Sequence, residues 1–189
     1  MEKKLNQRRT YRKAKLIVLK QTVMDPIDHL WSFIGAFLGI ALIGILQSMT
    51  LTSLDNTFLI GSFGASAVLI YGETNSPLAQ PRNLVGGHIL SAIIGVCVAK
   101  LIPDSNLSWL ACALAVSLAI VGMQITKTMH PPGGATALIA IIGSVEIRDL
   151  GFLYVINPVL IGVLILLVTA YITNRFARHR QYPVKPNRK

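Results

Sequence analysis

The most unusual run of residues in the chain is MHPPGGAT at 129–136. Proline is tolerated in the first turn of a helix, because the backbone N–H groups there have no partner within the helix, so the two prolines after His130 predict a helix start. A helix start presents free N–H donors and a partial positive charge, which bind anions without a full cation. The two glycines would let a ligand approach the backbone closely. The candidate binding residues of this run are His130, Gly133, Gly134, Ala135 and Thr136.

A second run, SFGAS at 62–66, resembles the first, since GASAVLI at 64–70 aligns with GATALIA at 134–140. Upstream, LWSFIGAFLGIALIGI at 30–45 aligns with SWLACALAVSLAIVGM at 108–123. An offset of roughly 70–78 residues is too long for a solenoid and indicates two halves of one domain. The alternative is that small residues and leucine recur by chance in membrane helices. The candidate binding residues of the first half are Ser62, Gly64, Ala65 and Ser66.

The third polar run is SPLAQPRN at 76–83, followed by GGH at 86–88. Arg82 either attracts an anion or anchors a helix at the lipid headgroups. His88 lies one turn into an apolar stretch, where a histidine either binds a substrate or hydrogen-bonds a neighbouring helix. Asn83 is expected to support the loop, as His130 is in its own run. Arg82, Asn83 and His88 therefore join the candidate binding residues.

The charges of the chain are concentrated at its two ends. The 189 residues are 52% hydrophobic with a mean hydropathy of +0.57, yet they carry a formal net charge of +10. Of the 18 Lys and Arg, 8 lie within residues 1–20 and 6 within 175–189, which leaves 4 for the residues between. The region between the two ends is apolar enough to lie in lipid. A folded basic face that binds nucleic acid is not indicated. The basic ends predict contact with anionic lipid and two cytoplasmic termini, hence an even number of crossings.

The apolar stretches predict an all-α membrane protein. A bilayer crossing takes about 20 helical residues, and four stretches are that long. They are 30–49, 83–102, 107–125 and 152–173, and two shorter apolar stretches lie at 57–71 and 132–145. The short stretches are either tilted crossings or re-entrant segments, so both six and four crossings remain open. We predict six hydrophobic segments, two of them short or broken, as an inverted 3+3 repeat, the arrangement in which matching short segments mark a transporter's binding site.

The predicted organisation has three parts. Residues 1–29 form a basic cytoplasmic segment, 30–174 the membrane domain with halves at about 30–102 and 107–174, and 175–189 a basic cytoplasmic tail. Small residues at four-residue spacing predict close helix packing, either within one bundle or between subunits of a homo-oligomer. These residues are Gly35 and Gly39, then Gly87, Ser91 and Gly95, then Ala111, Ala115 and Ala119.

Several functions lose support because the residues they need are missing from the sequence. No carboxylate lies within a predicted span, so a cation pump built on a buried acid has no candidate. HExxH, GxSxG and Walker motifs and paired carboxylates are absent, so we expect no enzymatic activity, no catalytic residues and no cofactor. Cys97 and Cys112 lie in apolar runs without a neighbouring His, which predicts packing rather than a disulfide or a metal site.

Three blocks in order, GASAVL at 64–69, SPLAQPRN with GGH at 76–88, and His130-Pro131-Pro132 extended by GGATA, resemble the HPP family of integral membrane proteins. The resemblance covers roughly residues 24–175. It implies a fold usually described with four spans and, for some members, nitrite transport. Plastid members are expected to carry a longer targeting extension than this chain shows. We therefore expect a multi-pass protein of a bacterial cytoplasmic membrane, cyanobacterial membranes included.

The resulting functional prediction is a small transporter for a small inorganic anion, nitrite in particular. The anion would bind at a midplane site formed by the N-termini of the two short helices. An anion channel is the nearest alternative, and its flux would not saturate with concentration. A non-transporting membrane scaffold or sensor, which recruits partners through the basic ends, is an alternative of a different class. Deleting residues 1–20 should abolish the function of a scaffold but leave a transporter's uptake intact.

Overall fold

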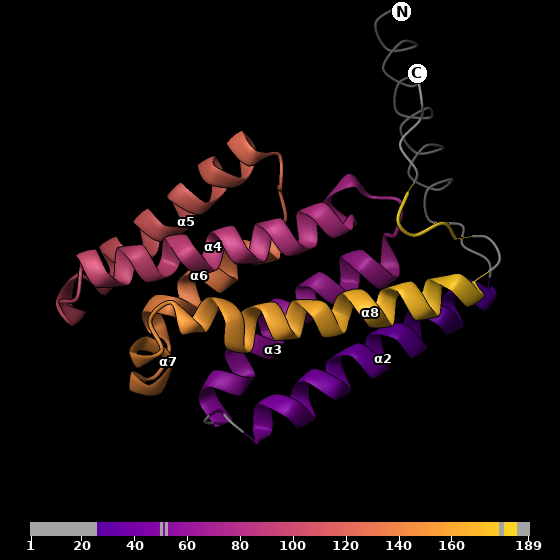
Figure 1. Cartoon of the computed structure of the whole chain (residues 1–189), viewed down its shortest axis with the longest axis horizontal. Coiled ribbons are helices and arrows are strands. Elements are labelled where there is room, and N and C mark those ends of the chain that lie inside the picture. Colours follow the sequence, from indigo (N-terminus) through magenta and orange to yellow (C-terminus); the bar gives the residue numbers. More distant parts are fainter. Residues whose placement is uncertain (1–25, 50, 52, 178–179, 185–189) are drawn as a thin grey trace, which may run out of the picture.

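The computed structural model describes residues 26–49, 51, 53–177 and 180–184, and every regular element within them is a helix (Figure 1). Most of the basic segment 1–29 and part of the basic tail lie outside the described residues. The helices are α2 (Pro26–Ser48), α3 (Ser53–Ala67), α4 (Pro81–Leu101), α5 (Ser108–Thr126), α6 (Pro132–Ile142), α7 (Val145–Asp149) and α8 (Ile161–Phe176). The π-helical turns η1 (Val68–Gly72) and η4 (Val155–Leu160) extend α3 and precede α8, and the 3-10 turns η2 (Pro77–Ala79) and η3 (Ser105–Leu107) precede α4 and α5.

The four predicted long spans are confirmed. Helical segments long and apolar enough to cross a bilayer are Pro26–Ser48, Pro81–Leu101, Ser105–Thr126 and Val155–Phe176. In the most apolar stretch of each segment, the share of residues that are buried is 44% for the segment of α4 and 39% for that of α8. The share is only 17% for the segment of α2 and 22% for that of α5. Large side chains on α2 and α5 such as Phe33, Phe37 and Trp109 therefore remain on the outside of the bundle. An apolar outer face of this kind is suited to lipid.

The two shorter segments differ from each other. Helix α3 and turn η1 run without interruption from Ser53 to Gly72, a length of about 30 Å at 1.5 Å per residue. Its apolar part, Leu59–Gly72, agrees with the short stretch predicted at 57–71. Asp55 accepts a hydrogen bond from the Ser144 N–H (2.9 Å) at one end of the bundle, and the Tyr71 carbonyl accepts one from Arg180 (2.7 Å) at the other. Helix α6 is short as expected, since its 11 residues extend only about 16 Å.

The contacts between helices agree with the predicted inverted repeat in part, so the repeat stays a prediction. If the two halves are repeats, α2 corresponds to α5, α3 to α6 and α4 to α8, so contacts should recur between corresponding pairs. Helix α2 packs on α8, and the corresponding pair, α5 and α4, also packs together. However, α4 packs most closely along α6, whereas the corresponding pair, α8 and α3, makes much smaller contact. Figure 1 likewise shows α8 lying along α2 and α5 lying over α4.

The close packing of α4 and α6, here called the α4–α6 seam, depends on glycine. A Cβ atom added at Gly95 would lie 2.6 Å from the Ala137 carbonyl oxygen, and one at Gly133 would lie 2.8 Å from Ser91 Oγ. A Cβ at Gly87 would lie 2.5 Å from the Cβ of His130. The small residues at four-residue spacing on α4 therefore pack within this bundle, as one of the two alternatives predicted.

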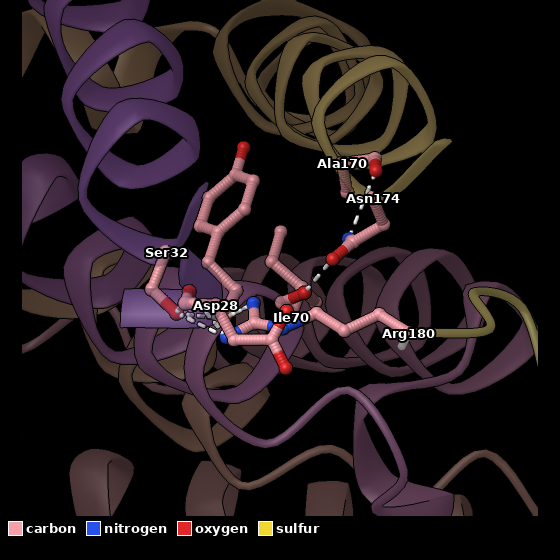
Figure 2. Close-up of polar contacts among 7 residues, drawn as sticks. Asp28, Ser32, Ile70, Ala170, Asn174 and Arg180 are labelled. Atoms are coloured by element: carbon pink, nitrogen blue, oxygen red, sulfur yellow. Dashed lines mark hydrogen bonds and ion pairs between the residues drawn. The ribbon is translucent and has the colours of Figure 1, made fainter. Parts of the chain in front are cut away.

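Arg180 closes the end of the bundle at which α2 begins and α8 ends (Figure 2). Its guanidinium donates to the carbonyls of Tyr71 (2.7 Å) and Asp28 (2.6 Å) and to Ser32 Oγ (2.8 Å). Its Nε also lies 3.5 Å from a carboxylate oxygen of Asp28, in an ion pair whose two side chains are 5% and 10% exposed. Residues 28 and 180 belong to the two predicted basic ends, and their pairing was not predicted. We call this arrangement the Arg180 clasp.

Candidate functional site

Five polar side chains meet inside the bundle where α3, α4 and α6 converge. Each of the five is at most 2% exposed. They are Ser62 and Ser66 on α3, His88 on α4, His130 in the connection between α5 and α6, and Thr136 on α6. We refer to these five residues as the buried cluster. Because a buried hydroxyl or imidazole without a partner costs free energy, the hydrogen bonds among the five determine how they are held.

Ser66 joins the two imidazoles. Its Oγ lies 2.8 Å from His88 Nε2 and 2.9 Å from His130 Nε2, and the centroids of the two rings are 5.0 Å apart. The other ring nitrogen of His130, Nδ1, lies 2.9 Å from the carbonyl oxygen of Leu78 in η2. His130 therefore connects the cluster to the loop that precedes α4.

Thr136 continues the cluster on the other side of His88. Its Oγ1 lies 2.7 Å from His88 Nδ1 and 3.0 Å from Ser62 Oγ. Ser62 has a second acceptor at the same distance, because the Pro132 carbonyl oxygen also lies 3.0 Å from its Oγ. The Tyr154 hydroxyl donates to the Thr136 carbonyl (2.9 Å) and fixes α6 against the segment that leads into α8.

Local sequence explains why these side chains meet. Ser62 and Ser66 are four residues apart, so they share one face of α3, and Ser66 Oγ also lies 3.3 Å from the Ser62 carbonyl oxygen. The lack of a side chain at Gly87 lets His130 approach α4, and the lack of one at Gly133 lets α6 approach Ser91. Gly133 thus positions the cluster through packing.

Four predicted binding residues line no part of the cluster. A Cβ added at Gly64 meets nothing within 4 Å, and the side chain of Ala65 is exposed. Gly134 and Ala135 are half-buried, and a Cβ at Gly134 would touch only Val116 at 4.0 Å. These residues turn away from the five polar side chains, because they occupy other faces of the same two helices.

Arg82 and Asn83 lie in the first turn of α4, beside the end of α5, rather than in the cluster. The exposed Arg82 donates from Nη2 to the Thr126 carbonyl (2.8 Å), and Asn83 donates from Nδ2 to the Met129 carbonyl (2.8 Å). Asn83 therefore supports the loop that carries His130, as the sequence analysis proposed. Arg82 ties the end of α5 to the start of α4.

The prediction of two helix N-termini was wrong for the first half. Helix α3 begins at Ser53, so residues 62–66 lie well inside it, where backbone N–H groups are already used by the helix. The second half does begin at Pro132 as predicted. There, however, the N–H groups of Gly133 and Gly134 donate to the carbonyls of His130 (2.9 Å) and Pro131 (3.0 Å). Side-chain hydroxyls and imidazoles, rather than free backbone donors, are the principal polar groups of the site.

A cleft of about 290 Å³ lies at the far end of the α4–α6 seam, opposite the Arg180 clasp. Its lining includes two of the four cations between the basic ends, Lys100 and Arg148, together with Asp104 and Asp149. This cleft was not predicted, because in the sequence Asp104, Arg148 and Asp149 fall in separate connections and Lys100 near the end of a span. Tyr154 and the Leu78 carbonyl were likewise not predicted as partners of the cluster.

Four helices able to cross a bilayer, packed around a buried polar cluster, define a multi-pass α-helical membrane protein. The chain belongs to the HPP transmembrane family, since the family model described as HPP, transmembrane region, matches residues 21–183. The resemblance carried by the three sequence blocks is therefore confirmed.

Two transmembrane proteins of Dictyostelium discoideum are similar to this chain. One is 53% identical over 167 residues, which cover 87% of this chain and 53% of that protein. The other is 48% identical over 155 residues, which cover 82% of this chain and 54% of that protein. The chain thus spans about half the length of the curated relatives it matches. No solved structure matches it. Both relatives come from a eukaryote, so the expected bacterial membrane finds no support in them.

Proposed function

We propose that the chain transports a small inorganic anion, nitrite in particular, through the buried cluster. The observation that carries this proposal is the meeting of three hydroxyls and two imidazoles, joined by hydrogen bonds, inside the bundle. Polar groups inside a membrane protein are expensive and are by default functional candidates. The choice of nitrite rests on the HPP resemblance, and nothing in the proposal requires a catalysed reaction or a cofactor.

The chemistry of the cluster suits a small anion. Hydroxyl and imidazole hydrogens are donors, and an anion in the cluster would accept hydrogens that the five residues otherwise share with one another. Access from one end is supported by the cleft at the far end of the α4–α6 seam, where Lys100 and Arg148 lie beside two acids, Asp104 and Asp149. The cluster itself would supply the selective step.

Nitrite uptake into proteoliposomes tests the proposal. The reconstituted chain should take up nitrite faster than protein-free vesicles, with a rate that saturates. Replacing Thr136 with valine removes one donor at nearly constant volume and should lower uptake roughly tenfold, because hydrogen bonds to charged groups contribute about 1.5–3 kcal/mol. Thr173→Val is the matched control, since that buried hydroxyl donates only within α8, to the Thr169 carbonyl (2.8 Å). No uptake above protein-free vesicles under any gradient would sink the proposal.

The two alternatives give different results in the same vesicles. A channel would show uptake that rises without saturation and no stimulation by nitrite on the opposite side. A scaffold or sensor would show no uptake, and its function would depend on residues 1–20.

We also propose that both basic ends face the cytoplasm, with the halves inverted. Under this topology Glu73 and Lys127, both exposed, lie on the cytoplasmic side. Support comes from the Arg180 clasp, which joins the start of α2 to the end of η1 just before Glu73. Single cysteines at positions 73 and 127, in a chain with Cys97 and Cys112 replaced by alanine, should react with an impermeant thiol reagent only after the cytoplasmic face is exposed. Labelling of both from outside would instead support four crossings.

A further inference from the structure

The hydrogen bonds of the buried cluster form one chain from Ser62 to Leu78. At the Leu78 end the direction is fixed, because a carbonyl oxygen only accepts, so His130 must carry its hydrogen on Nδ1. In a neutral His130 the other nitrogen, Nε2, is then an acceptor and receives the Ser66 hydroxyl hydrogen (2.9 Å). Ser66 has only one hydrogen, so its contact with His88 Nε2 (2.8 Å) requires His88 to donate.

The direction then propagates to the other end. With its hydrogen on Nε2, neutral His88 accepts at Nδ1 from the Thr136 hydroxyl (2.7 Å). Thr136 Oγ1 in turn accepts from the Ser62 hydroxyl (3.0 Å). Each of the five side chains thus donates one hydrogen toward Leu78, and the two imidazoles hold opposite tautomers.

One added proton reverses every contact except the last. When Ser62 Oγ receives a proton, its own hydroxyl hydrogen passes to Thr136 Oγ1, and the Thr136 hydrogen passes to His88 Nδ1. His88 then releases its Nε2 hydrogen to Ser66, and the Ser66 hydrogen passes to His130 Nε2. His130 then carries both ring hydrogens and the single positive charge, and it keeps its bond to Leu78. In this second arrangement Ser62 donates its new hydrogen to the Pro132 carbonyl, its other acceptor at 3.0 Å. Both arrangements therefore satisfy every member of the chain with the contacts present.

The described residues around the cluster supply no positive charge that could balance an anion, and this proton would supply one. Helix α6 carries no charged residue, and α3 carries only Asp55, which bonds Ser144 at the bundle end. The cations of α4, Arg82 and Lys100, lie near its two ends and are exposed. Two further described neighbours are uncharged aromatic residues: Tyr154 donates to the Thr136 carbonyl, and the ring of Phe63 lies 5.6 Å from that of His88. An anion among these residues meets no fixed cation, and a buried unpaired charge is costly.

We propose that the chain Ser62–Thr136–His88–Ser66–His130 takes up one proton with each anion, which makes transport an electroneutral proton–anion symport. The imidazolium formed on His130 balances the charge of the anion while both are inside the bundle, and the proton leaves with the anion on the other side. No proton site was predicted from the sequence, because no carboxylate lies within a predicted span. In this proposal two imidazoles bridged by a serine bind the proton instead. The inference rests on the proposed function, since its proton accompanies the same anion.

Proteoliposomes with an internal pH indicator test the symport. At neutral pH, where little free nitrous acid can leak, nitrite uptake corrected for protein-free vesicles should bring in about one proton per nitrite. An inside-alkaline pH gradient of one unit should support about tenfold accumulation, and an inside-positive potential set with potassium and valinomycin should not change the initial rate. Nitrite uptake without protons, driven by that potential, would overturn the symport and leave the proposed transport standing. No nitrite uptake at all would instead remove the proposed function.

Two variants and one spectroscopic measurement test the residue assignment. Ser66→Ala interrupts the chain between the imidazoles and should lower protons per nitrite at least fivefold. Ser91→Ala is the control, since this equally buried serine on α4 contacts only the sulfur of Met123 (3.8 Å) as a hydrogen-bond donor. An unchanged proton ratio in Ser66→Ala overturns the relay.

Nitrogen NMR of ¹⁵N-histidine-labelled protein in lipid covers the case in which Ser66→Ala fails to fold. The wild-type chain should give one buried imidazole protonated at Nδ1 and one protonated at Nε2, and acidification should convert one of them to imidazolium. Both buried rings in the same tautomer, or neither changing down to the pH at which the protein unfolds, would contradict the chain.

Discussion

Replacing Arg180 with methionine should lower the free energy of unfolding by about 3–5 kcal/mol, because removing one partner of a buried ion pair leaves the other charge uncompensated. Among the described residues, the Asp28 carboxylate, which is 10% exposed, would then lose the cation it pairs with. The Tyr71 and Asp28 carbonyls and Ser32 would each lose a donor. Methionine retains much of the length of the side chain and its apolar contacts. The measurement is equilibrium unfolding of the purified protein in detergent micelles.

Arg175→Met provides the control for this prediction. Arg175 carries the same charge in the last turn of α8 but is exposed, so its replacement should change stability by no more than about 0.5 kcal/mol. Adding Asp28→Asn to Arg180→Met should recover part of the loss, since the amide removes the unpaired charge. Equal effects of the two arginine variants would mean that the clasp contributes little to the stability of the bundle.

Replacing Gly95 with alanine should lower the free energy of unfolding by up to about 2 kcal/mol, because an extra methyl group in a well-packed site costs about 1–3 kcal/mol and the helix preference of alanine offsets about 1 kcal/mol of it. The added Cβ would lie 2.6 Å from the Ala137 carbonyl oxygen and 2.9 Å from the Ala140 Cβ, so α4 and α6 would have to separate. Alanine is preferred over glycine in helices by about 1 kcal/mol, yet this gain is smaller than the upper part of the packing cost. Nitrite uptake should fall as well, because His88 and Thr136 face each other across the same seam.

Gly64→Ala is the matched substitution on α3. A Cβ at Gly64 meets nothing within 4 Å, so stability should be unchanged or rise by up to about 1 kcal/mol, and uptake should remain near that of the wild type. Loss of stability in Gly64→Ala comparable to that in Gly95→Ala would show that backbone effects outweigh packing here. Loss of uptake with unchanged stability would restore Gly64 as a binding residue.

The individual residues of the cluster were predictable from sequence, but its internal bonds were not. Ser62, Ser66, His88, His130 and Thr136 all stood out as polar residues in apolar surroundings. Their hydrogen bonds, however, join residues 22 to 74 positions apart, and such distances depend on how the helices cross. Gly64, Ala65, Gly134 and Ala135 were included with them because short sequence motifs do not show which face of a helix turns inward.

The start of α3 shows a second limit. The glycine and small residues at 62–66 resembled a helix start by analogy with 132–136, yet the helix begins nine residues earlier, at Ser53. The proline pair that fixes the start of α6 has no counterpart in the first half, and without it the small residues continue the helix. The similarity of two runs therefore did not imply the same local structure.

The membrane class, the four long spans and the family follow from the amino-acid sequence alone, because hydropathy over about 20 residues and ordered motif blocks are local properties of the chain. Three other features became visible in the folded molecule: Arg180 pairs with Asp28, glycines of α4 let α6 and His130 approach, and two imidazoles share one serine. These contacts join distant segments, so they follow from the crossing and rotation of whole helices. The direction of the hydrogen-bond chain depends on that geometry, and so does the proposed uptake of a proton.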